Sequence, residues 1–200
     1  MPKHFCAQYW AQKVKRCASH TLNLILWTDV DKWLLSQPTT KAVYRSATAK
    51  CTALWNKTSR SSLATETVDE LVSKKLIVPC TTRWNFFYDA LARICGISMA
   101  DLNTISSKLG LTALTERERQ FLKKYCTAMK PLTVALDILQ GEDNCFHGTL
   151  LPTMETLMLK TEALKSGLQI LRDLPDAIVK VRTHELKTLL FIKWTLLYYS

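Results

Sequence analysis

Apolar side chains recur at intervals of three and four residues through most of this chain, which is the period of one face of an α-helix. The clearest case follows Thr115, where apolar positions keep that interval from Phe121 to Leu139. Glycine and proline, which break helices, number only 5 and 6 in 200 residues. The pattern therefore predicts a predominantly α-helical protein with enough apolar material for a core.

Local signals predict where these helices begin and end. Helices are expected over residues 16–35, 40–59, 63–74 and 84–95, and the chain beyond Gly96 is expected to contain helices only. Pro38 disfavours a helical backbone at Gln37, so the first helix should end there. Thr115 and Glu118 have the spacing of a capping box, which predicts a helix start, and Pro131 should kink the helix that follows.

One short run has the character of a strand. Leu76, Ile77 and Val78 are apolar and mostly β-branched, and Pro79 closes the run. The sequence therefore predicts a single short buried strand in an otherwise helical chain.

Positive charge is concentrated in the first third of the chain. The net charge is +10, and residues 1–60 carry ten lysines and arginines against two acids, whereas residues 141–200 carry seven of each. Such an excess suits an acidic partner, nucleic acid first and an anionic membrane surface second. In the helix expected over 40–59, the basic positions lie off the apolar stripe, which predicts a buried face and a base-rich solvent face.

Cysteine content and hydropathy bear on the cellular compartment and on whether the chain spans a membrane. Seven cysteines is an odd number and the chain opens without an apolar signal core, so we expect reduced thiols in the cytosol or nucleus. The longest apolar run, residues 188–199, contains Lys193 and is shorter than the ~20 residues that a membrane-spanning helix needs. No membrane span is expected.

Cys17 and His20 are three residues apart, which places both on one face of a helix. Together with His4 and Cys6 they offer four zinc ligands. The spacing argues against zinc, because His4 and Cys6 are cramped and the second pair falls inside a helix. The favoured interpretation is a small buried thiol beside a hydrogen-bonded histidine.

Arg83 and Trp84 lie at the predicted junction between strand and helix. There an arginine can contact a phosphate and a tryptophan can stack on a base. The alternative is structural, with Trp84 closing the core and Arg83 capping a neighbouring helix.

Three sequence blocks together resemble the hAT superfamily of DNA transposases and the host proteins descended from them. The blocks are RCASHTLNL at residues 16–24, PCTTRWN at residues 79–85 with Tyr88, and LTE at residues 114–116. The resemblance spans roughly residues 13–172, and residues 182–200 match the family pattern poorly.

The resemblance implies an RNase H-like α/β core interrupted by an all-helical insertion. The fold expected here is thus an incomplete core over residues 1–95 joined to a helical insertion region over residues 96–200. It also implies a nuclear protein that binds DNA, with Cys17 and His20 near the family's active site and Trp84, beside Arg83, stabilising a flipped base.

The departures from the family exclude its chemistry. hAT transposases use three carboxylates that hold divalent metal ions, and two of these lie upstream of the CxxH helix. This chain has no acid before Asp29, and the third carboxylate is expected beyond Ser200. We therefore expect a truncated relative that is not an enzyme and has no metal or cofactor.

Two functions follow as expectations. The first is weak, non-specific DNA binding through the basic first sixty residues, with Lys13, Lys15, Arg16, Cys17, His20, Arg83 and Trp84 as the candidate contact residues. The alternative is a helical interaction module, in which residues 96–200 bind a protein partner or a second copy of the chain.

Overall fold

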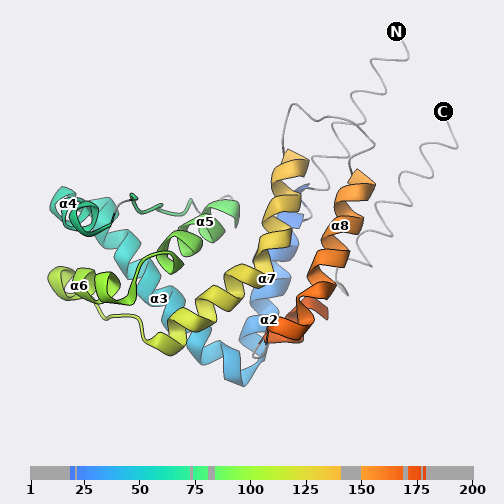
Figure 1. Cartoon of the computed structure of the whole chain (residues 1–200), viewed down its shortest axis with the longest axis horizontal. Helices are drawn as coiled ribbons and strands as arrows, with labels where there is room; N and C mark the ends of the chain where they lie inside the picture. The colour runs from blue at the N-terminus through green and yellow to red at the C-terminus, as the bar shows by residue number, and fades with distance from the viewer. Residues whose placement is uncertain are drawn as a thin grey trace, which may run out of the picture. The chain divides into compact units, whose positions relative to one another are not determined.

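The structure is a computed structural model that describes residues 19–20, 22–72, 74–80, 84–140, 150–168, 171–176 and 178. These residues are predominantly helical, as predicted (Figure 1). The elements are the π-helix η1 (Ile25–Val30), then α2 (Asp31–Ser36), α3 (Pro38–Arg60), α4 (Ser62–Leu71), α5 (Trp84–Cys95), α6 (Met99–Leu109), α7 (Glu116–Gln140), α8 (Leu150–Ala163) and the 3₁₀-helix η3 (Lys165–Gly167). None of these helices has the length and apolar character that crossing a bilayer requires.

The chain divides into two compact units. One consists of residues 34–129, and the other, called the terminal unit here, combines residues 1–33 with residues 130–200. The helices α2 and α7 contribute residues to both. The boundary predicted at residues 95/96 falls inside the 34–129 unit and stays a prediction.

The core of the 34–129 unit forms around one face of α3. The apolar stripe predicted on this helix is buried, with Trp55 2% exposed. Tyr44 packs against the rings of Phe121 and Tyr125 on α7, at centroid distances of 6.2 and 5.9 Å. On α5, Phe87 meets Trp55 edge-on at 5.9 Å. Ring packing of this kind joins α3 to both α5 and α7.

Two predicted helix boundaries are confirmed, and the residues expected to set them do so. Gln37 is extended, with φ −88° and ψ 116°, because Pro38 occupies the first turn of α3. The capping box is present: the Thr115 amide donates to Glu118 Oε2 at 2.7 Å, and the Glu118 amide donates to Thr115 Oγ1 at 3.3 Å. The helix α7 continues through Pro131 to Gln140.

The predicted strand is wrong. Residues 75–80 are non-helical, and no β-strand occurs anywhere in the described part of the chain. A strand is stable only where a neighbouring backbone supplies its hydrogen bonds, and local β-propensity cannot provide that neighbour. Leu76 and Ile77 are half-buried and Val78 is exposed, and this non-helical linker lies between α4 and α5 in the chain.

The terminal unit has a separate apolar core. Its buried residues include Leu132, Leu136 and Leu139 on α7 and Leu157 on α8. On α8 the buried Thr161 donates its hydroxyl to the Leu157 carbonyl at 2.6 Å, so no polar group of that side chain is left unpaired there. In this unit too, the apolar residues of the helices are the ones that are buried.

Candidate nucleic-acid interface

The outward face of α3 carries an exposed cluster of positive charge. This helix contains five lysines and arginines and no acid over its 23 residues. Four of the five, called the α3 basic face here, are exposed: Lys41, Arg45, Lys57 and Arg60. They lie away from the buried stripe that contains Tyr44 and Trp55. The helical period alone therefore places the basic side chains and the buried apolar side chains on different sides of α3.

The α3 basic face is long enough to follow a nucleic-acid backbone. Lys41 and Arg60 are nineteen positions apart, which corresponds to about 28 Å along a helix. The ion pairs found in the described residues join Lys50 to Glu118, Lys75 to Asp69, and Lys165 to Asp176. None of these pairs neutralises a base of the α3 basic face, so its charge remains available to a polyanion.

The fifth base of α3, Lys50, has a different role. Its ammonium lies 2.8 Å from Glu118 Oε2, and Ser46 Oγ donates to Glu118 Oε1 at 2.6 Å. Burial disfavours ionisation of Glu118, but hydrogen bonds from Lys50, Ser46 and Thr115 outweigh burial and lower its pKa to about 2. Lys50 therefore fixes α3 against the start of α7 and holds the helix that presents the basic face.

A shallow groove of about 400 Å³ opens at the C-terminal end of this face. It is lined by Asn56, Lys57 and Arg60 of α3, together with Leu111 from the loop before α7. The side chains of Lys57 and Arg60 supply positive charge, and the Asn56 amide supplies both a donor and an acceptor. Such a groove suits an anionic group such as a backbone phosphate.

The structure describes only some of the candidate contact residues that the sequence predicted. Lys13, Lys15, Arg16, Cys17 and Arg83 lie outside the described residues, as do His4 and Cys6. Their predicted roles therefore stay predictions. His20 is exposed.

Trp84 lies in the core of the 34–129 unit. It is 1% exposed, and its ring stacks on Tyr88 at a centroid distance of 5.7 Å and an interplanar angle of 29°. Contact between this ring and a nucleic-acid base would require the start of α5 to open. The position matches the structural alternative raised for this residue.

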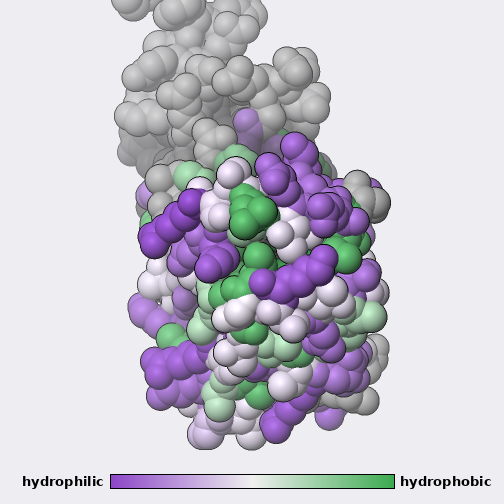
Figure 2. Space-filling model, turned by 90° about the vertical axis from the view of Figure 1, so that its left-hand side faces the viewer, coloured by the Kyte–Doolittle hydropathy of each residue, from purple (hydrophilic) through white to green (hydrophobic). Residues whose placement is uncertain are grey.

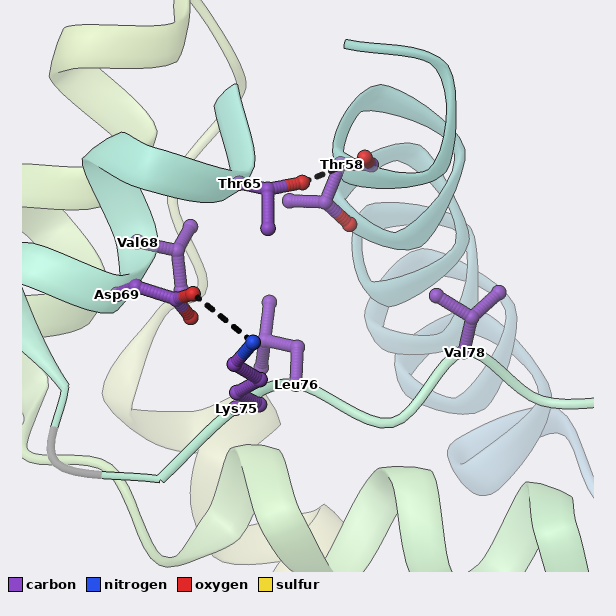
Figure 3. A pocket seen from close by; sticks show the side chains of 7 residues that line it. All are labelled: Thr58, Thr65, Val68, Asp69, Lys75, Leu76 and Val78. Atoms are coloured by element: carbon purple, nitrogen blue, oxygen red, sulfur yellow. Dashed lines mark hydrogen bonds and ion pairs between the residues drawn. The ribbon is translucent and has the colours of Figure 1, made fainter. Parts of the chain in front are cut away.

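A second cavity, of about 90 Å³, lies between α3, α4 and the linker to α5 (Figure 3). Thr65 donates its hydroxyl to the Thr58 carbonyl at 2.9 Å, and Lys75 pairs with Asp69 at 3.9 Å. The Thr65 hydroxyl has its partner within the protein, the Lys75 side chain is 85% exposed to solvent, and much of the remaining lining is apolar. We interpret this cavity as a packing defect with no group poised to recognise a ligand.

The α4–α6 side of the molecule differs from the α3 basic face. Figure 2 shows hydrophobic side chains through the middle of this side, between hydrophilic ones. On α4, Leu63 is an apolar side chain that is 72% exposed. The helix α4 also carries the exposed acids Glu66, Asp69 and Glu70, so it is a poorer surface for a polyanion than α3.

Within the described residues, no three histidine, cysteine, aspartate or glutamate side chains are grouped so that they could hold a metal ion. Comparison of the chain with known protein families, with characterised proteins and with solved structures found no match.

A base-rich solvent face was expected on this helix, but none of its bases was among the candidate contact residues. Arg60 was expected to lie beyond the helix, which was predicted to end at residue 59. The signal was present, since Lys57 and Arg60 are three positions apart and share one side of a helix.

Proposed function

We propose that this protein binds nucleic acid non-specifically, through contacts with backbone phosphates along the α3 basic face. The observation that carries the proposal is a 23-residue helix with four exposed bases, no acid and no ion pair to those bases among the described residues. Lysine and arginine contacts to phosphate supply most of the affinity in sequence-independent binding.

The resemblance to hAT transposases supports DNA as the polyanion and the nucleus as the location. Lys13, Lys15 and Arg16 would extend the contact surface, and Arg83 would add one further phosphate contact. No cofactor is needed for binding of this kind.

Neutralising two bases of the α3 basic face should weaken DNA binding strongly. We expect Arg45→Gln with Arg60→Gln to reduce affinity for a duplex by roughly a hundredfold at 50 mM salt, because two phosphate contacts are lost. Wild type should bind with Kd of ~10⁻⁴–10⁻⁶ M near physiological salt, whatever the DNA sequence. Fluorescence anisotropy with two unrelated duplexes measures both quantities.

The matched control removes the same charge elsewhere. Lys74 and Lys108 are exposed and lie outside α3, so Lys74→Gln with Lys108→Gln keeps the net charge equal to that of the test variant. The control should lose far less affinity than the test variant. Equal losses would show that binding follows net charge and has no preferred surface. A parallel variant at Lys13, Lys15 and Arg16 measures the contribution of the N-terminal bases.

A second function is supported by exposed apolar residues of the terminal unit. Val134 and Ile138 on α7 are 42% and 40% exposed, and both line a groove of about 190 Å³ with Pro152 and Leu157 of α8. A groove of this kind suits an apolar helix of a partner or of a second copy. Under this alternative the full-length chain self-associates, or captures a partner protein, and the α3 variants leave that association unchanged.

A further inference from the structure

The groove at the C-terminal end of α3 combines chemical groups of three kinds. It is called the α3–Leu111 groove here, and its lining consists of Ala53, Asn56, Lys57 and Arg60 of α3, Ser61 between α3 and α4, and Leu111 before α7. Ala53 and Leu111 are apolar, and Asn56 carries a neutral amide. Lys57 and Arg60 supply the positive charge. A phosphate alone needs only the cations, so the apolar pair and the amide point to a ligand with a further part.

The four α3 residues of the groove share one side of the helix. Positions 53, 56, 57 and 60 have the spacing of neighbours on a helical surface, and all four are exposed. From Ala53 to Arg60 this side of the helix rises about 10 Å. The apolar end of the groove therefore lies about two turns from the cationic end. One nucleotide can reach both, with its base at the first and its phosphate at the second.

Backbone hydrogen bonds hold Leu111 in the lining of the groove. Gly110 ends α6 with φ 65°, a left-handed conformation that glycine adopts without strain. Its amide donates to the Ser107 carbonyl at 3.2 Å, and the Leu111 amide donates to the Ser106 carbonyl at 2.8 Å. The position of the half-buried Leu111 is therefore set by the turn that ends α6.

The polar groups of the groove are available to a ligand. Within the described residues no hydrogen bond uses the Asn56 amide, and no acid pairs with Lys57 or Arg60. Ser61 differs, because its hydroxyl accepts a hydrogen bond from the Ala64 amide at 3.3 Å and caps α4. A ligand would therefore meet one neutral amide and two cations that the protein itself does not use.

We propose that the α3–Leu111 groove holds one unpaired nucleotide, whose phosphate contacts Lys57 and Arg60. Its base lies against the apolar side chains of Ala53 and Leu111. The juxtaposition that carries the proposal is two cations and an unengaged amide beside two apolar side chains. The groove has a volume of about 400 Å³, which is typical of sites for small organic molecules. This inference rests on the proposed function and adds to it a preference for strands with unpaired bases.

Asn56 contacts the edge of the base in this arrangement. Its amide offers both a donor and an acceptor, so it pairs with the hydrogen-bonding edge of any base. In a duplex these edges are already paired and the faces are stacked, so taking one base out of the duplex costs free energy. A single strand exposes both the edge and the face. The groove therefore contributes to the binding of a single strand and not to that of an intact duplex.

Two single strands with equal numbers of phosphates test the proposal. One is an oligothymidine of about twelve residues, and the other has the same backbone with an abasic tetrahydrofuran residue at every position. Phosphate contacts alone bind the two strands equally, whereas the groove favours the strand with bases. We expect wild type to bind the oligothymidine about tenfold tighter than the abasic strand, from the added hydrogen bond and apolar contact. Fluorescence anisotropy of labelled strands at low salt measures the ratio.

Variants that keep the net charge locate the site. Asn56→Ala with Leu111→Ser removes the amide and the apolar side chain, so the preference for the oligothymidine should disappear while binding of the abasic strand stays unchanged. The matched control is Asn103→Ala with Leu63→Ser, which removes the same two side chains from exposed positions on α6 and α4. The control should keep the wild-type preference.

Equal binding of the two strands by wild type would overturn the proposal. A preference that persists in Asn56→Ala with Leu111→Ser would also overturn it, because the base would then be bound elsewhere. Both results leave phosphate binding along the α3 basic face intact, since the abasic strand is still bound. Failure of wild type to bind either strand would instead contradict the proposed function together with this inference.

Discussion

Replacing Glu118 with alanine is expected to lower the free energy of unfolding by about 3 kcal/mol, because the change leaves Lys50 largely buried without its counter-charge. The Lys50 and Glu118 side chains are only 18% and 8% exposed, and their charged atoms are 2.8 Å apart. The same carboxylate accepts hydrogen bonds from Ser46 on α3 and from the Thr115 amide at the start of α7. Its loss therefore removes a helix cap and the polar link between two helices together.

Two further variants separate these contributions in urea denaturation. Glu118→Gln keeps an acceptor for the Thr115 amide and should lose less, about 2 kcal/mol. Glu116→Ala, in the same helical turn but exposed, should change stability by no more than about 0.5 kcal/mol. Equal losses for Glu116→Ala and Glu118→Ala would contradict the assigned role of Glu118.

The stabilisation by Glu118 should also depend on pH. The pKa of Glu118 is depressed in the folded state, to about 2 from an ordinary value of 4.5. The contribution is therefore complete above pH 4.5 and is lost as pH falls toward 2. The stability difference between wild type and Glu118→Gln should shrink over that range, and a difference that stays constant would contradict the assignment.

Replacing Trp84 with alanine is expected to lower the free energy of unfolding by about 3–5 kcal/mol, because the ring is buried at the start of α5. The ring stacks on Tyr88, so the change removes an aromatic contact and leaves a cavity. Thermal and urea denaturation of the full-length chain measure the loss.

Matched variants on the same helix distinguish a core role from a binding role. Phe86 is two residues away but 40% exposed, so Phe86→Ala should cost less than about 1.5 kcal/mol. Trp84→Phe should keep the fold at a smaller cost than Trp84→Ala. A folded Trp84→Phe protein with unchanged DNA affinity would assign Trp84 to the core, and selective loss of binding would assign it to the interface.

The sequence predicted those features that depend on neighbouring residues. The start of α3 follows from Pro38 acting on Gln37, and the start of α7 follows from the pairing of Thr115 with Glu118. The base-rich outer face of α3 follows equally, because the helical period alone separates its bases from Tyr44 and Trp55. Such signals act between residues a few positions apart, so a single sequence is sufficient to predict these features.

Features that depend on distant segments were not predictable from sequence. Residues 76–78 have strand-forming side chains, but whether a strand forms depends on a partner backbone elsewhere. The link from Lys50 to Glu118 has the same origin, since it depends on how α3 meets α7.

The salt dependence of DNA binding tests the central claim most directly. Each phosphate contact adds about −0.9 to the slope of log K against log salt, so the four bases of the α3 basic face contribute about −3.6. We therefore expect the slope to become about 1.8 less steep in Arg45→Gln with Arg60→Gln and to stay near the wild-type value in Lys74→Gln with Lys108→Gln. Identical slopes for all three proteins, or a wild-type slope near zero, would contradict the claim that α3 is the nucleic-acid surface.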